Sequence, residues 1–296
     1  MQATQAIDDK QASERGISQR TFKAAAWLGW QIEANWADPL IFFIYSVIKP
    51  LSGAAILVVM YGVITNGAYD SPVFAYIYLG NAFYIYVAAV LNGISWCVIE
   101  DREFYRMLKY IYIAPVQVPV YLLGRGFAKF IFGSLAVFIT IAVGMIFLGL
   151  PLDFGLVNWP LFVVSLVMGI LMLAMMGLAL GSVMLVIVNN ANFVGEAVAG
   201  ALFLFSGAVF PISILPAWLQ PIGYIVPISY WLELLRRALV GQVAEAFPTF
   251  SQFSDMQLLG ILAGLTALFT AVGFVAFHYC DRHARERGYI DRYSNF

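Results

Sequence analysis

Long apolar stretches alternate with short polar connections along most of this chain. A hydrocarbon layer of about 30 Å needs about 20 helical residues to cross it. Six stretches meet this need, although the fifth is short: approximately Pro39 to Ile64, Val73 to Ile99, Val120 to Leu148, Trp159 to Val188, Val194 to Phe210 and Met256 to Tyr279. The pattern predicts an all-α membrane protein with six transmembrane helices.

Composition supports this prediction. Of the 296 residues, 62% are hydrophobic and 11% are charged, whereas soluble domains are about half apolar and a quarter charged. The net charge of −1 gives no indication of a nucleic-acid partner. The two cysteines, Cys97 and Cys280, are too few for a disulfide framework and are interpreted as packing residues. No standard metal-ligand spacing is present, so no metal site is predicted.

The distribution of Lys and Arg predicts the orientation. Basic residues occur in the N-terminal tail, after the second span and in the C-terminal tail, whereas residues 65–72 and 149–158 contain none. Arg236 and Arg237 are the exceptions. This bias predicts that both termini are cytoplasmic and that the protein crosses the cytoplasmic membrane. We expect a tail with an interfacial helix at 1–38, a six-span domain at 39–281 and a cytoplasmic tail at 282–296.

The segment before the last span is apolar but broken by four prolines: Pro211, Pro216, Pro221 and Pro227. It is too apolar for an aqueous loop and too broken for one spanning helix. Irregular backbone at membrane depth is tolerated only where protein covers it or where it lines a cavity. We therefore predict an outer re-entrant segment of short helices. Trp218 and Trp231 would anchor it at the interface, and Glu233 and Arg237 would form an ion pair on a short interfacial helix.

The connection after the second span, from Glu100 to Pro115, is predicted to be one amphipathic helix. Arg102, Arg106 and Lys109 follow helical spacing and would form a basic stripe. This helix could lie on lipid headgroups, or it could dock into a cleft of a soluble partner.

Several motifs resemble those of type-2 ATP-binding-cassette (ABC) exporter permeases. The Ser206-Gly207-Ala208-Val209-Phe210-Pro211 turn is followed by Leu215-Pro216-Ala217-Trp218-Leu219-Gln220-Pro221 and by Val226-Pro227. Asp101-Arg102-Glu103 and Ala114-Pro115 match the two ends of the motif that follows the second span in that family. The departures are Val226, where the family often has Asn, and Tyr105-Arg106, which replace a Gly-Thr pair.

The resemblance implies partners that this chain needs. None of the five lysines follows Gly or precedes Ser or Thr, so the sequence contains no P-loop. Two copies of a separate ATPase subunit, holding ATP and Mg²⁺, are therefore expected beside a second copy of this permease or a close paralogue. This chain is expected to contact membrane lipid, to bind no cofactor and not to be an enzyme itself.

The resemblance also suggests three sets of functional residues. Coupling to the ATPase is expected of Arg102, Glu103, Arg106 and Lys109. The outer gate is expected at Phe210, Pro211, Leu215 and Trp218. The second and fifth spans would line the substrate pathway with Tyr76, Asn81, Phe83, Tyr84, Phe193, Glu196 and Phe203. For the aromatic residues packing is an alternative interpretation, and Glu196 could instead lie near the headgroups.

The implied function is ATP-driven export of an amphipathic substrate, such as a drug, a lipid or a lipid-linked glycan. One alternative is a permease that exports a polysaccharide or O-antigen-type glycan. An alternative from another class is an ATP-independent channel or secondary carrier. No chain of acidic residues for proton coupling and no inverted repeat support this last class.

Overall fold

The computed structural model describes residues 2–35, 38, 40, 41, 44, 48–67, 69, 71–242 and 248–292. Every regular element in these ranges is helical, which confirms the predicted fold class. The elements are α1 (Gln2–Asn35), α3 (Lys49–Thr65), α4 (Pro72–Tyr86), η2 (Val87–Asn92), α5 (Gly93–Ile99), η3 (Glu100–Phe104), α6 (Leu108–Ile113), α7 (Val118–Leu148), α8 (Trp159–Val186), α9 (Ala191–Phe205), η4 (Ile212–Ile214), α10 (Gln220–Ile225), α11 (Pro227–Val240), η5 (Pro248–Phe250), α12 (Asp255–Glu286) and η6 (Tyr289–Asp291).

Within the described residues, four helices are long and apolar enough to cross a membrane: Pro72–Phe104, Val118–Leu148, Trp159–Val186 and Asp255–Glu286. The second of the predicted spans is thus longer than expected, because the helix continues past Ile99 through the π-helical turn η3. α3 and the apolar part of α9, Phe193–Phe205, are shorter. Part of the first predicted span, at 39, 42–43 and 45–47, lies outside the described residues. The count of six spans therefore stays a prediction.

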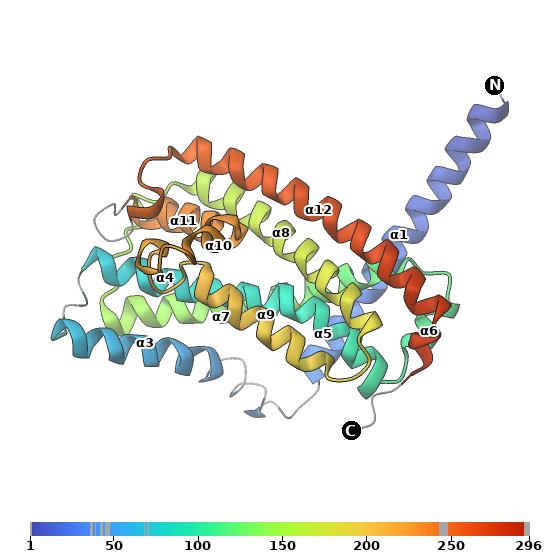
Figure 1. Cartoon of the computed structure of the whole chain (residues 1–296), viewed down its shortest axis with the longest axis horizontal. Helices are drawn as coiled ribbons and strands as arrows, with labels where there is room; N and C mark the ends of the chain where they lie inside the picture. Colours follow the sequence, from blue (N-terminus) through green and yellow to red (C-terminus); the bar gives the residue numbers. More distant parts are fainter. Residues whose placement is uncertain are drawn as a thin grey trace.

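From α3 onward, the long helices alternate in direction along a common axis (Figure 1). α10 and α11 lie at one end of the bundle and α6 at the other, with both marked chain ends nearer α6 (Figure 1). We call these the α10 end and the α6 end. The central helix α4–η2–α5 packs against α7, α8 and α11, and α12 runs along α8. α4 is buried over most of its length, so it forms the centre of the core.

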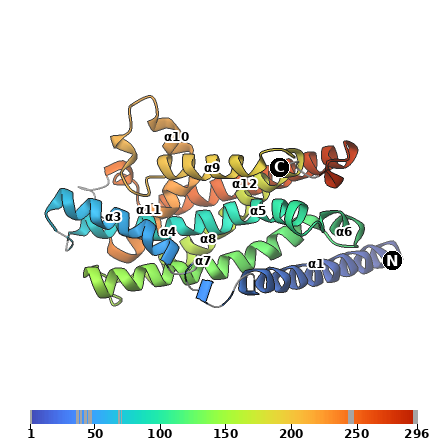
Figure 2. The same cartoon turned by 90° about the horizontal axis from the view of Figure 1, so that it is seen from below.

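The predicted interfacial helix lies within α1, which packs along α7 (Figure 2). Two glycines allow this close approach. A Cβ at Gly29 would overlap Ala128, and a Cβ at Gly124 would overlap Ala25. α1 is therefore attached to the bundle along α7, and its N-terminal part extends beyond the other helices (Figure 1).

Prolines begin helices in this protein more often than they interrupt them. α4, α7, α8, α10 and α11 each have Pro at their first or second position. Proline suits this position because the first N–H groups of a helix have no intrahelical partner. The broken segment therefore becomes a series of short helices, as predicted, in which Pro221 is the second residue of α10 and Pro227 is the first residue of α11.

Candidate functional site

Helix α11 carries three ionisable side chains into the protein interior, where Glu233, Arg236 and Arg237 are all buried. Arg237 Nε donates to Glu233 Oε1 at 2.8 Å, which confirms the predicted ion pair. The predicted interfacial position of its helix is wrong, because α11 packs against α4, α8 and α12. Pro227 starts the helix inside the bundle, so its charges must find partners there.

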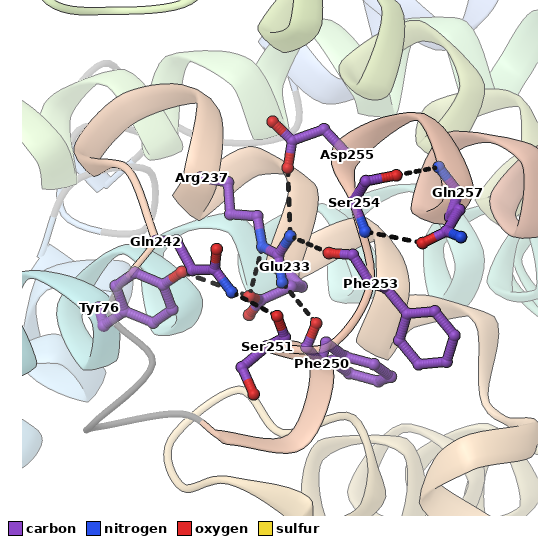
Figure 3. Close-up of polar contacts among 10 residues, drawn as sticks. All are labelled: Tyr76, Glu233, Arg237, Gln242, Phe250, Ser251, Phe253, Ser254, Asp255 and Gln257. Atoms are coloured by element: carbon purple, nitrogen blue, oxygen red, sulfur yellow. Dashed lines mark hydrogen bonds and ion pairs between the residues drawn. The ribbon is translucent and has the colours of Figure 1, made fainter.

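Arg237 joins α11 to the start of α12 (Figure 3). Its Nη2 donates to the Phe250 carbonyl at 2.7 Å, and its Nη1 donates to the Phe253 carbonyl at 2.8 Å. Nη1 also contacts Asp255 Oδ1 at 3.1 Å. Because a guanidinium offers five N–H donors in a fixed plane, one side chain joins α11 to Phe250, Phe253 and Asp255.

Arg236 holds the Ser-Gly turn that precedes the proline-rich segment. Its Nη2 donates to the carbonyls of Gly207 at 2.9 Å and Ala208 at 2.6 Å. Its guanidinium also lies 5.4 Å from the ring centroid of Tyr76, the range of a cation–π contact. A Cβ at Gly80 would overlap both Arg236 and the Ala208 carbonyl, so glycine is needed at this position of α4. We call Tyr76, Glu233, Arg236, Arg237 and Asp255 the α11 cluster.

Trp231 does not anchor the segment at the interface, contrary to the prediction. Its ring is fully buried and its edge faces Tyr86, with centroids 6.2 Å apart. A Cβ at Gly169 of α8 would overlap the indole, so this glycine provides the space for it. Trp218, in contrast, is 76% exposed, as an interfacial residue would be.

The predicted gate residues lie in and beside the turn held by Arg236. Phe210 and Pro211 are half-buried and Leu215 is buried, next to η4. The predicted fifth span was too long, because α9 ends at Phe205 and Phe210 lies in the turn that follows. Gly207 has a φ of 69°, in the left-handed region that favours glycine, and this reverses the chain after α9. Whether these residues form a gate stays a prediction.

A second polar cluster lies toward the α6 end, and Arg125 of α7 is at its centre. Arg125 Nη1 contacts Asp101 Oδ1 at 2.7 Å, and Nη2 contacts Glu100 Oε2 at 2.6 Å. Tyr121 donates its hydroxyl to Asp101 Oδ2 at 2.9 Å. Arg125 and Asp101 have no exposed surface, so their charges are compensated entirely inside the protein.

Lys129 extends this cluster to the N-terminal helix. It lies one helical turn beyond Arg125 and forms ion pairs with Glu100, at 3.0 Å, and with Glu33 of α1. We call Glu33, Glu100, Asp101, Tyr121, Arg125 and Lys129 the α7 cluster. Through it, ion pairs join α1, η3 and α7, which are far apart in sequence.

The segment from Glu100 to Pro115 does not form one continuous coupling helix, so this prediction is wrong. The chain forms η3, turns at Arg106, whose φ is 52°, and then begins the short helix α6. Arg102 is buried, where it contacts Glu103 and donates to the carbonyls of Met184 and Ile187 at the end of α8. Arg102 satisfies carbonyls at the end of α8 that lack intrahelical partners. Because its side chain is buried there, Arg102 does not form an exposed basic stripe with Arg106 and Lys109. Arg106 is exposed, and Lys109 and Glu103 are half-buried.

The short helix α6 is attached to the last helix of the chain. Tyr112 donates its hydroxyl to Asp281 Oδ1 at 2.7 Å, and the Arg285 guanidinium lies 4.8 Å from the centroid of the same ring. Burial, together with this hydrogen bond, raises the pKa of Tyr112 above its ordinary value, so the donor proton is retained. Movement of α6 would therefore be transmitted to α12.

Some of the predicted pathway residues are buried within the chain, and others are exposed on its surface. Tyr76 and Phe83 are buried inside the chain, where Tyr76 donates to Glu233 and Phe83 packs near Phe162. Tyr84 and Phe203 meet edge to face at 4.9 Å, and Tyr84 donates to the Ala199 carbonyl of α9 at 2.6 Å. Phe203 is exposed on α9, as are Phe193 and Glu196. Asn81 of α4 is half-buried. Contact with a substrate stays a prediction for all seven.

Comparison with protein families matches residues 21–240 to the ABC-2 type transporter. The match covers more than half of the chain, including the Ser-Gly turn and the Asp-Arg-Glu segment. This chain belongs to the ABC-2 type transporter family. The domain of this family is the transmembrane component of an ABC transporter rather than its ATPase. A search of curated proteins found no significant match to this ABC-2 type transporter chain.

Sequence reasoning missed the partners of Arg125 and Lys129 in this ABC-2 type transporter chain. A usable signal was present. Arg125 and Lys129 are spaced i, i+4 within an apolar span, and ionisable groups in such a position need partners. Glu100 and Asp101 were adjacent acidic candidates. Within the described residues, no group of three or more His, Cys, Asp and Glu side chains is placed to hold a metal ion.

Proposed function

We propose that this chain is the membrane-spanning subunit of an ATP-driven exporter of amphipathic molecules. The observation that carries the proposal is the family match over residues 21–240, because that domain forms the transmembrane part of ABC transporters. A separate ATPase subunit, in two copies, would supply the energy. A second copy of this chain or a close paralogue would complete the pathway.

The exposed face of α9 supports the proposed pathway. Phe193 is 65% exposed, and Phe203 and Glu196 are also exposed. Aromatic rings with one acidic group provide a surface for a molecule that has both apolar and polar parts. Tyr84 supports the ring of Phe203 from inside the chain. We therefore restrict the proposed substrate contacts to this face, with Tyr84 in a positioning role.

The α6 end offers a route for coupling. Arg106 lies at the turn before α6, and Lys109 lies within α6. This helix is attached to α12 through Tyr112. η3, which precedes this turn, is attached to α7 through Glu100 and Asp101. A partner that pushes on α6 would thus displace two long helices. We propose that Arg106 and Lys109 contact the ATPase and that Arg102 positions their turn.

Orientation can be tested by cysteine labelling. In a background with Cys97 and Cys280 replaced by Ser, a single cysteine at Arg106 or at Ala217 is exposed to an impermeant maleimide added to intact cells. The proposal expects labelling at Ala217 and no labelling at Arg106 until the cells are opened. The reverse pattern would place the α6 end outside and contradict a cytoplasmic ATPase contact.

The function is tested by co-expression with candidate ATPase subunits, followed by purification into lipid nanodiscs and measurement of ATP hydrolysis. Amphipathic drugs, lipids and lipid-linked glycans are compared as stimulants. Phe203→Ala is expected to reduce stimulation, whereas Phe138→Ala, an exposed control on α7, is not. The charge reversals Arg106→Glu and Lys109→Glu are expected to weaken co-purification, with Arg287→Glu as the control. Co-purification with no ATPase, together with uptake that does not depend on ATP, would favour a channel or carrier.

A further inference from the structure

An apolar groove lies between α7 and α8. Its volume is about 390 Å³, and it is lined by apolar residues alone. α7 contributes Leu123, Phe127 and Phe130, and α8 contributes residues between Leu166 and Met175. At about 1.5 Å per helical residue this part of α8 is about 14 Å long. The groove therefore has the length and composition to hold part of one acyl chain.

The groove opens toward the side of the bundle. Val167 and Leu171 on its α8 wall and Phe127 on its α7 wall are exposed apolar side chains. They lie in two helices that are long and apolar enough to span a membrane, so in a bilayer this opening would face lipid tails. Ala174 lines the groove and is only half-buried, so an acyl chain has room to lie against it.

A polar hollow adjoins the groove at Phe22. Phe22 of α1 lines both, and the hollow is completed by Ser18, Gln19, Lys23 and Val120 near the start of α7. This lining includes no carboxylate. Along α7, the neighbouring cations Arg125 and Lys129 are already paired with acidic side chains of the α7 cluster. Lys23 is exposed and is the positive group that faces this hollow.

We propose that this site binds one anionic phospholipid of the surrounding bilayer, with its phosphate at Lys23 and one acyl chain in the groove. Phe22 would lie at the boundary between headgroup and tail. Because the ligand would contact α1, α7 and α8 together, it would stabilise the attachment of the N-terminal helix. The proposal rests on the membrane fold and does not require that this lipid is transported.

Native mass spectrometry tests the charge preference. Protein in detergent is incubated with phosphatidylglycerol or phosphatidylcholine, and the retained lipid is counted. Wild-type protein is expected to retain one phosphatidylglycerol in preference to phosphatidylcholine. Lys23→Gln should lower this preference about fivefold, as the loss of one cation near a lipid phosphate predicts. Arg287→Gln, which removes an exposed charge outside both hollows, should leave it unchanged. Equal retention of the two lipids by wild-type protein would overturn the proposal.

A photoactivatable acyl chain tests where the tail lies, first in wild-type protein and then in a variant with a filled groove. Phosphatidylglycerol carrying a diazirine in its tail is added to wild-type protein in nanodiscs, and the labelled peptides are identified. Labelling is expected to concentrate at 123–130 and 166–175, and Ala174→Phe should remove it while the helix content by circular dichroism is retained. Labelling spread evenly over the lipid-facing helices would show ordinary annular lipid and overturn the site. Protection of the groove by a cross-linked second copy of this chain would also overturn it.

Discussion

The two buried polar clusters compensate their cationic side chains in different ways. In the α7 cluster, Arg125 and Lys129 are neutralised by carboxylates from two other elements. In the α11 cluster, Arg237 pairs with the buried Glu233, and backbone carbonyls accept hydrogen bonds from both Arg236 and Arg237. The first cluster joins regular helices to one another. The second holds the turn after α9 and the turn between η5 and α12.

This difference follows from where unsatisfied backbone groups occur. Inside a helix each carbonyl already has a partner, so helices can be joined only through side chains. The turns at Gly207–Ala208 and Phe250–Phe253 direct carbonyls toward the buried side chains of Arg236 and Arg237, and buried carbonyls need donors. A guanidinium with several donors meets that need, which explains why arginine is found there. The α7 cluster should therefore govern global stability, and the α11 cluster the local order of the re-entrant segment.

The largest effect is expected from Arg125→Met. It leaves Asp101 without its cation in the interior, and breaking a buried pair costs about 3–5 kcal/mol of unfolding free energy. Unfolding in mixed lipid–detergent micelles measures this loss. Arg282→Met, whose pair with Glu286 is exposed, is the control and should change little. Adding Asp101→Leu to Arg125→Met should restore part of the stability. Equal losses for the two single variants would refute the distinction between buried and exposed pairs.

A smaller and local effect is expected from Arg236→Met. The carbonyls of Gly207 and Ala208 lose their donor, at a cost of about 2–3 kcal/mol for buried unsatisfied groups. Hydrogen exchange should rise at 206–215 while α1 and α7 remain protected. Arg102→Met is the matched control, because Arg102 also donates to backbone carbonyls but at the α6 end. If exchange rises equally along the whole chain, Arg236 has a global role and the comparison fails.

Leu215→Ala tests whether the re-entrant segment also depends on packing. Leu215 is buried, so the substitution should cost about 2 kcal/mol, the lower part of the range for large-to-small changes. Ile214→Ala, at an exposed neighbouring position, should cost much less. In the complex with an ATPase, we expect raised basal ATP hydrolysis for Leu215→Ala only. Unchanged basal hydrolysis, despite the measured loss of stability, would argue against a gate at this segment.

The smallest effect is expected from Asp255→Asn. Its side chain is half-exposed and contacts Arg237, which keeps Glu233 and two carbonyls as partners. Exposed or partly exposed pairs contribute about 0–1 kcal/mol. Thermal unfolding should therefore shift only slightly, and much less than for Glu233→Gln, which removes the buried carboxylate of the same cluster. A shift for Asp255→Asn as large as that for Glu233→Gln would mean that Asp255 compensates the buried charge.

Local features of this protein followed directly from its sequence. Apolar length predicted a helical membrane protein, four closely spaced prolines predicted the series of short helices, and i, i+4 spacing predicted the pair of Glu233 and Arg237. The family motifs were also readable without the structure. Each of these features depends on residues close together in the chain, where backbone geometry dictates which side chains can meet.

Tertiary structure decided which face of each helix is covered. Trp231 and its helix are buried, although their composition also suits a membrane interface. The sequence could not predict this burial, because lipid tails and a protein core are similarly apolar and hydrophobicity alone does not distinguish them. The partners of Arg125 come from a helix 24 residues away in sequence. The segment before the turn at Arg106 is attached to the end of α8 through Arg102. Periodicity shows which residues share a face, and only the packed bundle shows what that face contacts.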